Sequence, residues 1–341
     1  MKARLLRFLG AEDNEAGRVG LLLIMSFFMG VFLATLSVGS QTLFLQHFDE
    51  KKDLPYALLR SGIFGLIATL LYNFLQNRIP FQILALLSLV VMTAITAFLE
   101  FGEGFFQDPN DIYFLGFTQI IPFTFVILLV FWGSFNRLFN LRQAKRLVGV
   151  VDQGAMVASI LAFFSIPIYL GLEIKPKPET LYTISLISIG FFLITFLYLS
   201  FRHLNKKRSF SQEKLNLKKL GFTELIRNKY LLYLSLFIVA SMMATNFVEY
   251  SFLNVTTLYA DQGGLNLASF LSYFEMTIVI FTFLLETLAA DKIMHHYGMR
   301  VSLLVAPVLI GFFTITAFIL GSIFGYTPDQ NLFVVFFLMI A

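Results

Sequence analysis

The chain has 341 residues, of which 57% are hydrophobic and only 13% are charged, with 42 phenylalanines and a mean hydropathy of +0.78. About a quarter of the residues in a soluble domain are charged, so this composition excludes an ordinary soluble protein. The formal net charge of +4 arises between the apolar runs, which indicates contact with anionic lipid rather than with nucleic acid.

Nine apolar runs follow one another along the chain, and each is long enough to cross a bilayer. A helix needs roughly 20 residues to span a hydrocarbon core of about 30 Å. Lipid also requires helices here, because an open sheet would leave backbone groups without hydrogen bonds. The sequence therefore predicts an all-α membrane protein, a helical bundle with nine complete transmembrane helices. We expect them at residues 19–46, 54–76, 81–101, 112–135, 147–172, 181–201, 230–258, 267–290 and 301–324.

The two ends of the chain differ from these runs. Residues 1–18 place Lys2, Arg4 and Arg7 beside apolar residues, a pattern typical of a short helix on a membrane surface. Residues 331–341 are apolar but, at about 1.5 Å per residue, cover only roughly half a bilayer. We expect a truncated tenth helix there, in a fragment of a twelve-helix chain. The alternative is a re-entrant tail of a complete protein.

The basic residues between the runs predict the orientation. With the N-terminus inside, most of the 25 lysines and arginines fall in inner segments, above all in residues 202–229. The outer loops keep only Lys51, Lys52, Lys175 and Lys177. Such a bias sets the orientation of a membrane protein during insertion. The sequence therefore predicts a multi-pass protein with a cytoplasmic N-terminus.

The basic stretch also divides the chain into parts. We expect a cytoplasmic segment at residues 1–18, a six-helix bundle at 19–201, a cytoplasmic linker at 202–229 and a partial second bundle at 230–341. Two helical halves joined by a basic inner linker are the layout of a major-facilitator transporter, in which the halves rock around a central site. This layout predicts a secondary transporter that works by alternating access.

Acidic residues inside apolar runs are the first candidates for a functional site. A charge at the centre of a membrane costs about 2.5–3.5 kcal/mol on insertion scales, so such residues seldom face lipid. Glu249 lies one turn from Asn246 in the seventh run, and Glu275 lies near the middle of the eighth. Either acid could bind substrate or carry a coupling proton, or it could form structural hydrogen bonds between helices. Gln41 in the first run and Gln119 in the fourth are weaker candidates for lining the same cavity.

Charged residues near the inner ends of the helices indicate salt bridges that hold or gate the bundle. One is expected at the start of the fifth run, between Asp152 and a preceding basic residue such as Arg146, in preference to a proton site at Asp152. Glu286 could form another salt bridge, with Lys292 or Arg300. These residues belong to a short charged link at residues 291–300, which is similar to the loop that latches one conformation in many facilitators. The charges of this link are Asp291, Lys292 and Arg300.

Small residues in the fifth run predict close helix packing. Gly149, Gly154 and Ala158 lie in that run, and small side chains let the backbones of membrane helices approach each other. We expect a neighbouring helix to lie against them.

The sequence shows no signature of catalysis or metal binding. Neither a P-loop nor an H-E-x-x-H pattern occurs, and no segment between the runs is long enough for a soluble domain. The chain has no cysteine, which excludes disulfides and thiolate metal sites. His295 and His296 lack further metal ligands nearby in the sequence. We therefore expect a protein that is not an enzyme and that binds no metal or cofactor.

Two short segments carry a resemblance to a known family. Residues 131–136 have the sequence Phe-Trp-Gly-Ser-Phe-Asn and are followed by an Ala-Lys-Arg turn at 144–146; residues 246–249 are Asn-Phe-Val-Glu. The first segment resembles the Phe-Trp-Gly-x-x-Asn segment and following turn of the ATP/ADP translocase family of plastids and intracellular bacteria. The second is similar to the Asn-Leu-Val-Glu segment of that family.

The resemblance implies a major-facilitator-type fold of twelve helices, exchange of nucleotides and a location in a bacterial inner (plasma) membrane. The implied partners are the lipid bilayer and a nucleotide or other small anionic solute. Phosphate groups need positive donors, and Arg60 is the one basic residue deep in an apolar run. This scarcity motivates a second hypothesis, a non-transporting membrane anchor or sensor for a soluble domain encoded downstream.

Overall fold

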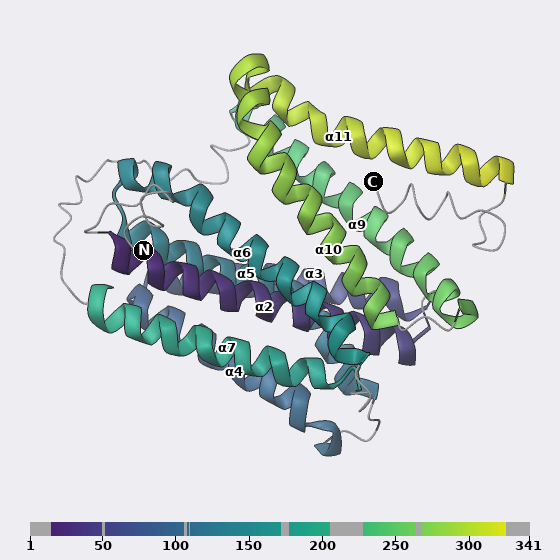
Figure 1. The fold of residues 1–341 in the computed structure, drawn as a ribbon, viewed down its shortest axis with the longest axis horizontal. Helices are drawn as coiled ribbons and strands as arrows, with labels where there is room; N and C mark the ends of the chain where they lie inside the picture. The colour runs from purple at the N-terminus through teal and green to yellow at the C-terminus, as the bar shows by residue number, and fades with distance from the viewer. Residues whose placement is uncertain are drawn as a thin grey trace. The chain divides into compact units, whose positions relative to one another are not determined.

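The structure is a computed structural model that describes residues 15–49, 52–105, 108, 110–171, 177–204, 228–263 and 267–324. The regular elements in these residues are all helices (Figure 1), which confirms the prediction of an all-α protein. The long helices are α2 (Ala16–His47), α3 (Asp53–Gln76), α4 (Phe81–Phe101), α5 (Asn110–Leu138), α6 (Leu141–Leu170), α7 (Thr180–Leu199), α9 (Lys229–Gly263), α10 (Leu267–Leu284) and α11 (Asp291–Phe324). Three short helices accompany them: η1 (Glu103–Phe105), η2 (Ser200–Leu204) and η3 (Leu285–Ala290).

The long helices follow the predicted membrane runs. Among the described residues, eight helices are long and apolar enough to cross a membrane. The ninth predicted run lies in α11, where an apolar stretch covers Pro307–Leu320. The tenth, at residues 331–341, lies outside the described residues. The chain is therefore a multi-pass membrane protein, as its hydropathy indicates.

Local sequence explains where several helices begin. Pro80 stands directly before α4 with a φ of −55°, and a proline suits this position because it fixes φ and needs no hydrogen bond from its nitrogen. Asn140 and Gln143 form a capping box at the start of α6.

The prediction of a non-helical link at residues 291–300 is wrong, since α11 is already helical from Asp291. That segment contains no proline, and its lysine, methionines and arginine favour a helix.

The chain forms two compact units. The first comprises Met1–Lys206 with Leu265–Thr287, and the second comprises Lys207–Gly264 with Leu288–Ala341. Helices α2 to α7 and α10 thus belong to the first unit, and α9 and α11 to the second. Most of the expected linker at residues 202–229 lies outside the described residues, so the predicted domain boundaries stay predictions.

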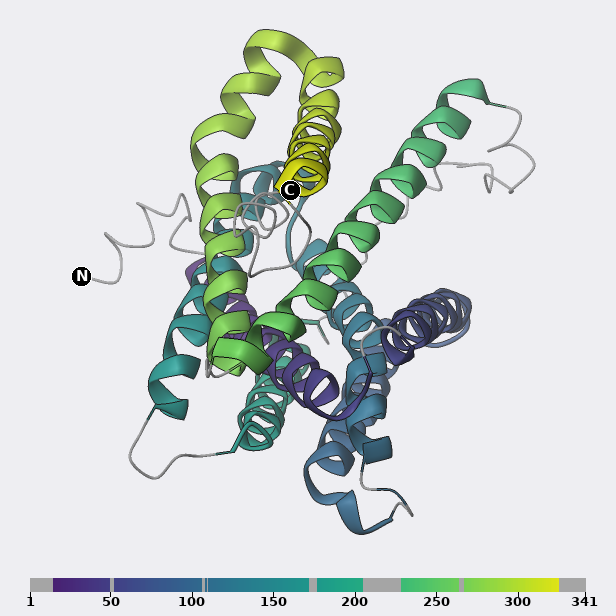
Figure 2. The same cartoon turned by 90° about the vertical axis from the view of Figure 1, so that its right-hand side faces the viewer.

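In the first unit, α2 is the central helix. It packs against α5, α6 and α7, while α3 packs on α5, α4 on α7 and α10 on α6 (Figure 1, Figure 2). Aromatic rings fill much of the core: Phe32 and Phe123 stack with centroids 6.2 Å apart, and Phe131 and Phe192 are fully buried. Lipid is as apolar as these side chains, so close packing holds the helices together more than exclusion of water does.

Glycines on both helices bring α2 and α6 close together. A Cβ atom at Gly30 would lie 2.6 Å from the Ala155 carbonyl oxygen and 3.0 Å from the Ala158 Cβ. A Cβ atom at Gly154 would lie 2.8 Å from the Ser26 Oγ. The predicted packing role is therefore confirmed for Gly154 and Ala158. It is wrong for Gly149, where a Cβ atom would meet nothing within 4 Å.

Candidate functional site

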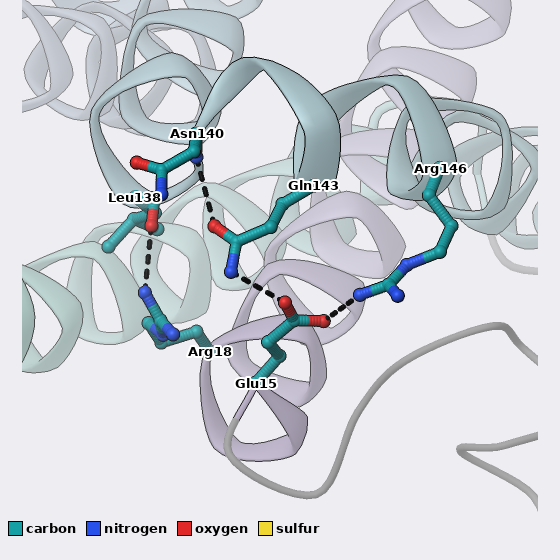
Figure 3. Close-up of polar contacts among 6 residues, drawn as sticks. All are labelled: Glu15, Arg18, Leu138, Asn140, Gln143 and Arg146. Atoms are coloured by element: carbon teal, nitrogen blue, oxygen red, sulfur yellow. Dashed lines mark hydrogen bonds and ion pairs between the residues drawn. The ribbon is translucent and has the colours of Figure 1, made fainter.

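A buried carboxylate joins the start of α2 to the start of α6 (Figure 3). Glu15 directly precedes α2 and is fully buried. Gln143 Nε2 donates a hydrogen bond to Glu15 Oε1 at 2.6 Å, and Arg146 forms an ion pair with Glu15 Oε2 at 2.5 Å. These partners lie 128 and 131 residues further along the chain. Glu15 therefore fixes two transmembrane helices to each other at one end of the bundle.

The turn between α5 and α6 is held by the same group of side chains. Gln143 Oε1 accepts a hydrogen bond from the backbone N–H of Asn140 at 2.9 Å, and Arg18 Nη1 donates to the Leu138 carbonyl at 2.9 Å. A negative charge directly before α2 also interacts favourably with the positive end of that helix. We call this set of side chains the polar clamp: Glu15, Arg18, Gln143 and Arg146.

Sequence reasoning identified only one of the four residues of the polar clamp, Arg146. It expects Arg146 to bridge to Asp152, whereas the structure pairs Arg146 with Glu15. Glu15 escapes notice when residues 1–18 are treated as one surface segment. An acid directly before an apolar run is, however, a helix-start signal, and that signal could have identified it.

Two predicted acids come together between α6 and α10. Asp152 on α6 is half-buried, Glu286 in η3 is exposed, and their negative charges repel each other. One residue further along, Gln153 Nε2 donates a hydrogen bond to Thr287 Oγ1 at 3.3 Å. Binding a proton or a cation would relieve such repulsion. Across the described residues, no group of three or more His, Asp or Glu side chains is arranged to hold a metal ion.

The other predicted acids lie on α9 and α10. Glu275 is half-buried on α10, one turn beyond Ser272, whose Oγ donates to the Phe163 carbonyl of α6 at 2.6 Å. Glu249 lies on α9 in the second unit, one turn from Asn246. The Asn246 amide donates to a carbonyl of its own helix at 2.8 Å. The roles expected for these residues stay predictions.

The two predicted glutamines lie in the first unit. Gln41 on α2 is 5% exposed, and no described residue donates a hydrogen bond to its Oε1. The buried Oγ1 of Thr42 also lacks a partner among these residues. Gln119 on α5 is half-buried. An unpaired buried polar group costs about 1–3 kcal/mol. This cost makes Gln41 a suitable residue to contact a polar solute or water.

The remaining predicted charges lie at the start of α11. Asp291, Lys292 and Arg300 are part of its first three turns, but their side chains lie outside the described part of the structure. The expected pairing of Glu286 with Lys292 or Arg300 therefore stays a prediction.

The Phe-Trp-Gly-Ser-Phe-Asn segment lies on α5 and borders a cleft that α3 and the start of α4 also line. Trp132, Gly133 and Asn136 contribute to this cleft of about 470 Å³. Arg137 lies beside them, with its guanidinium carbon 3.8 Å from the ring centre of Phe81, and it donates to the Gly133 carbonyl at 2.9 Å. This cleft is thus lined by apolar side chains and by the positive charge of Arg137.

Arg60 borders a second cleft between α3 and α5. This cleft of about 440 Å³ is also lined by Asp111, Phe114 and Thr118. The guanidinium carbon of Arg60 lies 5.1 Å from the ring centre of Phe114, a distance at which a cation is attracted to an aromatic face. Arg60 therefore supplies a positive donor within a membrane-spanning helix.

Comparison with known families gives one match. The model of the family described as TLC ATP/ADP transporter matches residues 118–340, which is more than half of the chain. Comparisons with curated proteins and with solved structures find no match. The matched region begins within α5 and includes the Phe-Trp-Gly-Ser-Phe-Asn segment, the Ala-Lys-Arg turn and residues 246–249. The resemblance seen in the sequence is therefore confirmed, and the chain belongs to the TLC ATP/ADP transporter family of membrane carriers.

Proposed function

We propose that this carrier exchanges nucleotides, or closely related phosphate-bearing anions, across a membrane by alternating access. The observation that carries the proposal is the family match over residues 118–340. The helical bundle supports it, because eight described helices can cross a membrane. Polar and charged side chains on these helices offer contacts for a charged solute, and residues of this kind in membrane helices commonly mark substrate pathways.

Arg60 is the proposed phosphate contact. Its planar guanidinium can donate two parallel hydrogen bonds to a phosphate, and it borders the cleft between α3 and α5. Asp111 in the same cleft would repel a phosphate in the absence of the arginine. Arg60 therefore has two functions in this proposal, since it attracts the anion and offsets the nearby acid.

Two acidic residues in membrane helices are proposed to couple transport to a proton or to bind the substrate. We propose that Glu275 and Glu249 bind substrate or carry a coupling proton, with Asn246, Gln41 and Gln119 as neutral polar contacts. Glu275 lies half-buried in a membrane helix, and an ionisable residue in such a place commonly marks a substrate or ion pathway. In reconstituted vesicles, Glu275→Gln is expected to abolish stimulation of exchange by a pH gradient. Stimulation equal to that of the wild type would remove this role, and Glu249→Gln tests the second acid in the same way.

The proposal is tested by exchange in proteoliposomes. Vesicles loaded with unlabelled ADP should take up labelled ATP or ADP, while vesicles without internal nucleotide should take up little. Arg60→Ala is expected to lower the exchange rate at least tenfold, and Arg60→Lys to recover only part of it, because lysine cannot form the bidentate contact. Arg78→Ala is the matched control. Like Arg60, Arg78 lies over a phenylalanine ring, that of Phe74, but it lies beyond the end of α3.

The same assay distinguishes the second hypothesis. Absence of exchange with every nucleotide, in protein that is folded and still binds nucleotide, would favour the anchor or sensor function over transport. Equal exchange rates for wild type and Arg60→Ala would leave transport intact and remove Arg60 from the site.

We also propose a location in a cell inner membrane with a cytoplasmic N-terminus. The bias of basic residues towards one set of loops supports this orientation. Because the chain has no cysteine, single cysteines at positions 51 and 206 can be labelled without background. A reagent that does not cross the membrane should label position 51 in intact cells and position 206 only after permeabilisation; labelling of both from one side contradicts the orientation.

A further inference from the structure

A cleft at the opposite end of the bundle from the polar clamp is lined by several residues with side-chain oxygen atoms. It lies where α4 ends and α5 and α7 begin, and it has a volume of about 210 Å³. Glu100, Glu179, Thr180 and Tyr182 contribute oxygen atoms to its lining. The cleft contains none of the residues assigned to nucleotide exchange above.

Within the described part of the chain, three of these oxygen atoms have no hydrogen-bond partner of good geometry. They are Oε2 of Glu100, Oε2 of Glu179 and the hydroxyl of Tyr182, each buried from solvent. The Tyr182 side chain is only 1% exposed. The Tyr182 hydroxyl lies near Ser40 of α2, and both carboxylates line the same cleft as Tyr182. A buried oxygen without a hydrogen-bond partner is unfavourable, and more so when it carries a charge, so the arrangement calls for a positively charged occupant.

The position of Glu100 at a helix end makes a positively charged partner for its carboxylate still more favourable. That residue lies in the last turn of α4, where the partial negative charge of the helix end disfavours a carboxylate. Only one of its oxygens is paired, since Oε1 accepts a hydrogen bond from Thr183 Oγ1 at 2.5 Å. Glu179, by contrast, precedes α7 and benefits from the positive end of that helix. The helix ends therefore disfavour the charge of Glu100 more than that of Glu179.

Among the residues that the structure describes, none supplies the missing positive charge. Lys177 also lines the cleft, but neither orphan carboxylate oxygen receives a hydrogen bond from it. Lys177 is exposed, and its backbone carbonyl accepts the Thr180 hydroxyl at 2.6 Å. The two carboxylates thus carry more charge than the lysine offsets, and no described residue donates a hydrogen bond to their free oxygens.

We propose that Glu100, Glu179 and Tyr182 form a binding site for a small hard cation of the Na⁺ or Ca²⁺ class. Carboxylate and hydroxyl oxygens are the ligands that such ions prefer. The cleft is large enough for the ion to keep some of its water, which completes the coordination. A bound cation links the end of α4 to the start of α7 and removes the repulsion between the two acids. This site is independent of the proposed nucleotide exchange.

The test is the thermal unfolding of the full chain in detergent micelles. A chloride salt of Na⁺ or Ca²⁺ should raise the melting temperature of the wild type by several degrees above that in N-methylglucamine chloride of equal ionic strength, because a ligand bound only by the folded state stabilises it. Glu100→Gln and Glu179→Gln should each lose most of this rise. The comparison of the two salts shows whether the site prefers the monovalent or the divalent ion.

The melting temperature of Glu100→Gln without added cation shows whether Glu100 binds an ion or has only a structural role. Neutralising an unpaired acid removes repulsion, so Glu100→Gln should melt at or above the wild-type temperature in the N-methylglucamine salt. A fall there, with the cation response retained, assigns Glu100 only to the hydrogen bond with Thr183 and overturns the proposal. Tyr182→Phe keeps the ring and should weaken the response at least several-fold.

Two further variants serve as controls. Asp108→Asn changes an exposed acid at the same end of the bundle and should keep the full cation response. Lys177→Gln should keep or increase the response, whereas its loss would show that the lysine and not an ion neutralises the acids. A wild-type melting temperature that responds to pH but to neither cation would assign the site to a proton and overturn the proposal. None of these results depends on nucleotide exchange.

Discussion

Gly30→Val is expected to destabilise the first unit by about 1–3 kcal/mol, the usual cost of overpacking a filled interior. The new Cβ atom would lie 2.6 Å from the Ala155 carbonyl oxygen, a backbone atom that cannot move aside as a flexible side chain can. The new Cβ atom would also lie only 3.0 Å from the Ala158 Cβ, which is a second close contact. Helices α2 and α6 would have to separate, and α2 is the helix on which α5, α6 and α7 all pack.

Gly20→Val is the matched control for this prediction. Gly20 lies on the same helix, and a Cβ atom there would meet nothing within 4 Å. Valine is a better helix former than glycine, so the control should melt at or slightly above the wild-type temperature. Thermal unfolding in detergent micelles measures both variants. Equal melting temperatures for Gly30→Val and the wild type would contradict the close approach of α2 and α6.

Reversing one charge of the polar clamp is expected to destabilise the bundle by about 3 kcal/mol, a cost typical of breaking a buried ion pair. Glu15→Arg would place a second guanidinium beside Arg146 at a fully buried position and would remove the acceptor of the Gln143 amide. Because the Arg146 side chain is 37% exposed, water offsets part of the loss, so we expect the lower end of the range for buried pairs.

The reciprocal exchange shows whether the loss comes from this pair. The double variant Glu15→Arg with Arg146→Glu restores the attraction with its direction reversed, and it should recover part of the lost stability, as in a double-mutant cycle. Lys145→Glu changes an exposed neighbour on the same turn and should cost no more than about 0.5 kcal/mol, as for most surface changes. A double variant no more stable than the worse single one would show that Glu15 and Arg146 do not interact directly.

The polar clamp gives a physical account of the Ala-Lys-Arg residues at 144–146, which lie in the first turns of α6 and not in a turn before it. Arg146 is the last of the three, and its ion pair with Glu15 holds the start of α2 against the start of α6. The capping box of Asn140 and Gln143 sets the direction in which α6 leaves the turn. The residues that carry the family resemblance at this point therefore organise the bundle, and they contribute no donor to the clefts lined by Arg60 and Arg137.

The candidate site was only partly predictable from sequence. Glu275, Glu249 and Gln41 stand out because a polar residue inside an apolar run is costly and calls for an explanation. Glu100 and Glu179 do not stand out, since they lie at helix ends where acids are common. Tyr182 resembles any other aromatic residue of the runs. Only packing shows that these three leave oxygen atoms buried and unpaired in one cleft.

The sequence by itself determined that this protein is an all-helical, multi-pass membrane carrier, and it placed most of the helices within a few residues. It could do so because lipid forces the backbone to satisfy its hydrogen bonds within each helix, and this constraint acts locally along the chain. Tertiary structure alone decided that Arg146 pairs with Glu15, that α2 lies closely on α6 through Gly30, and that Glu100 and Tyr182 line one cleft. These contacts join residues far apart in the chain, and which helix faces meet depends on side-chain shapes that periodicity does not encode.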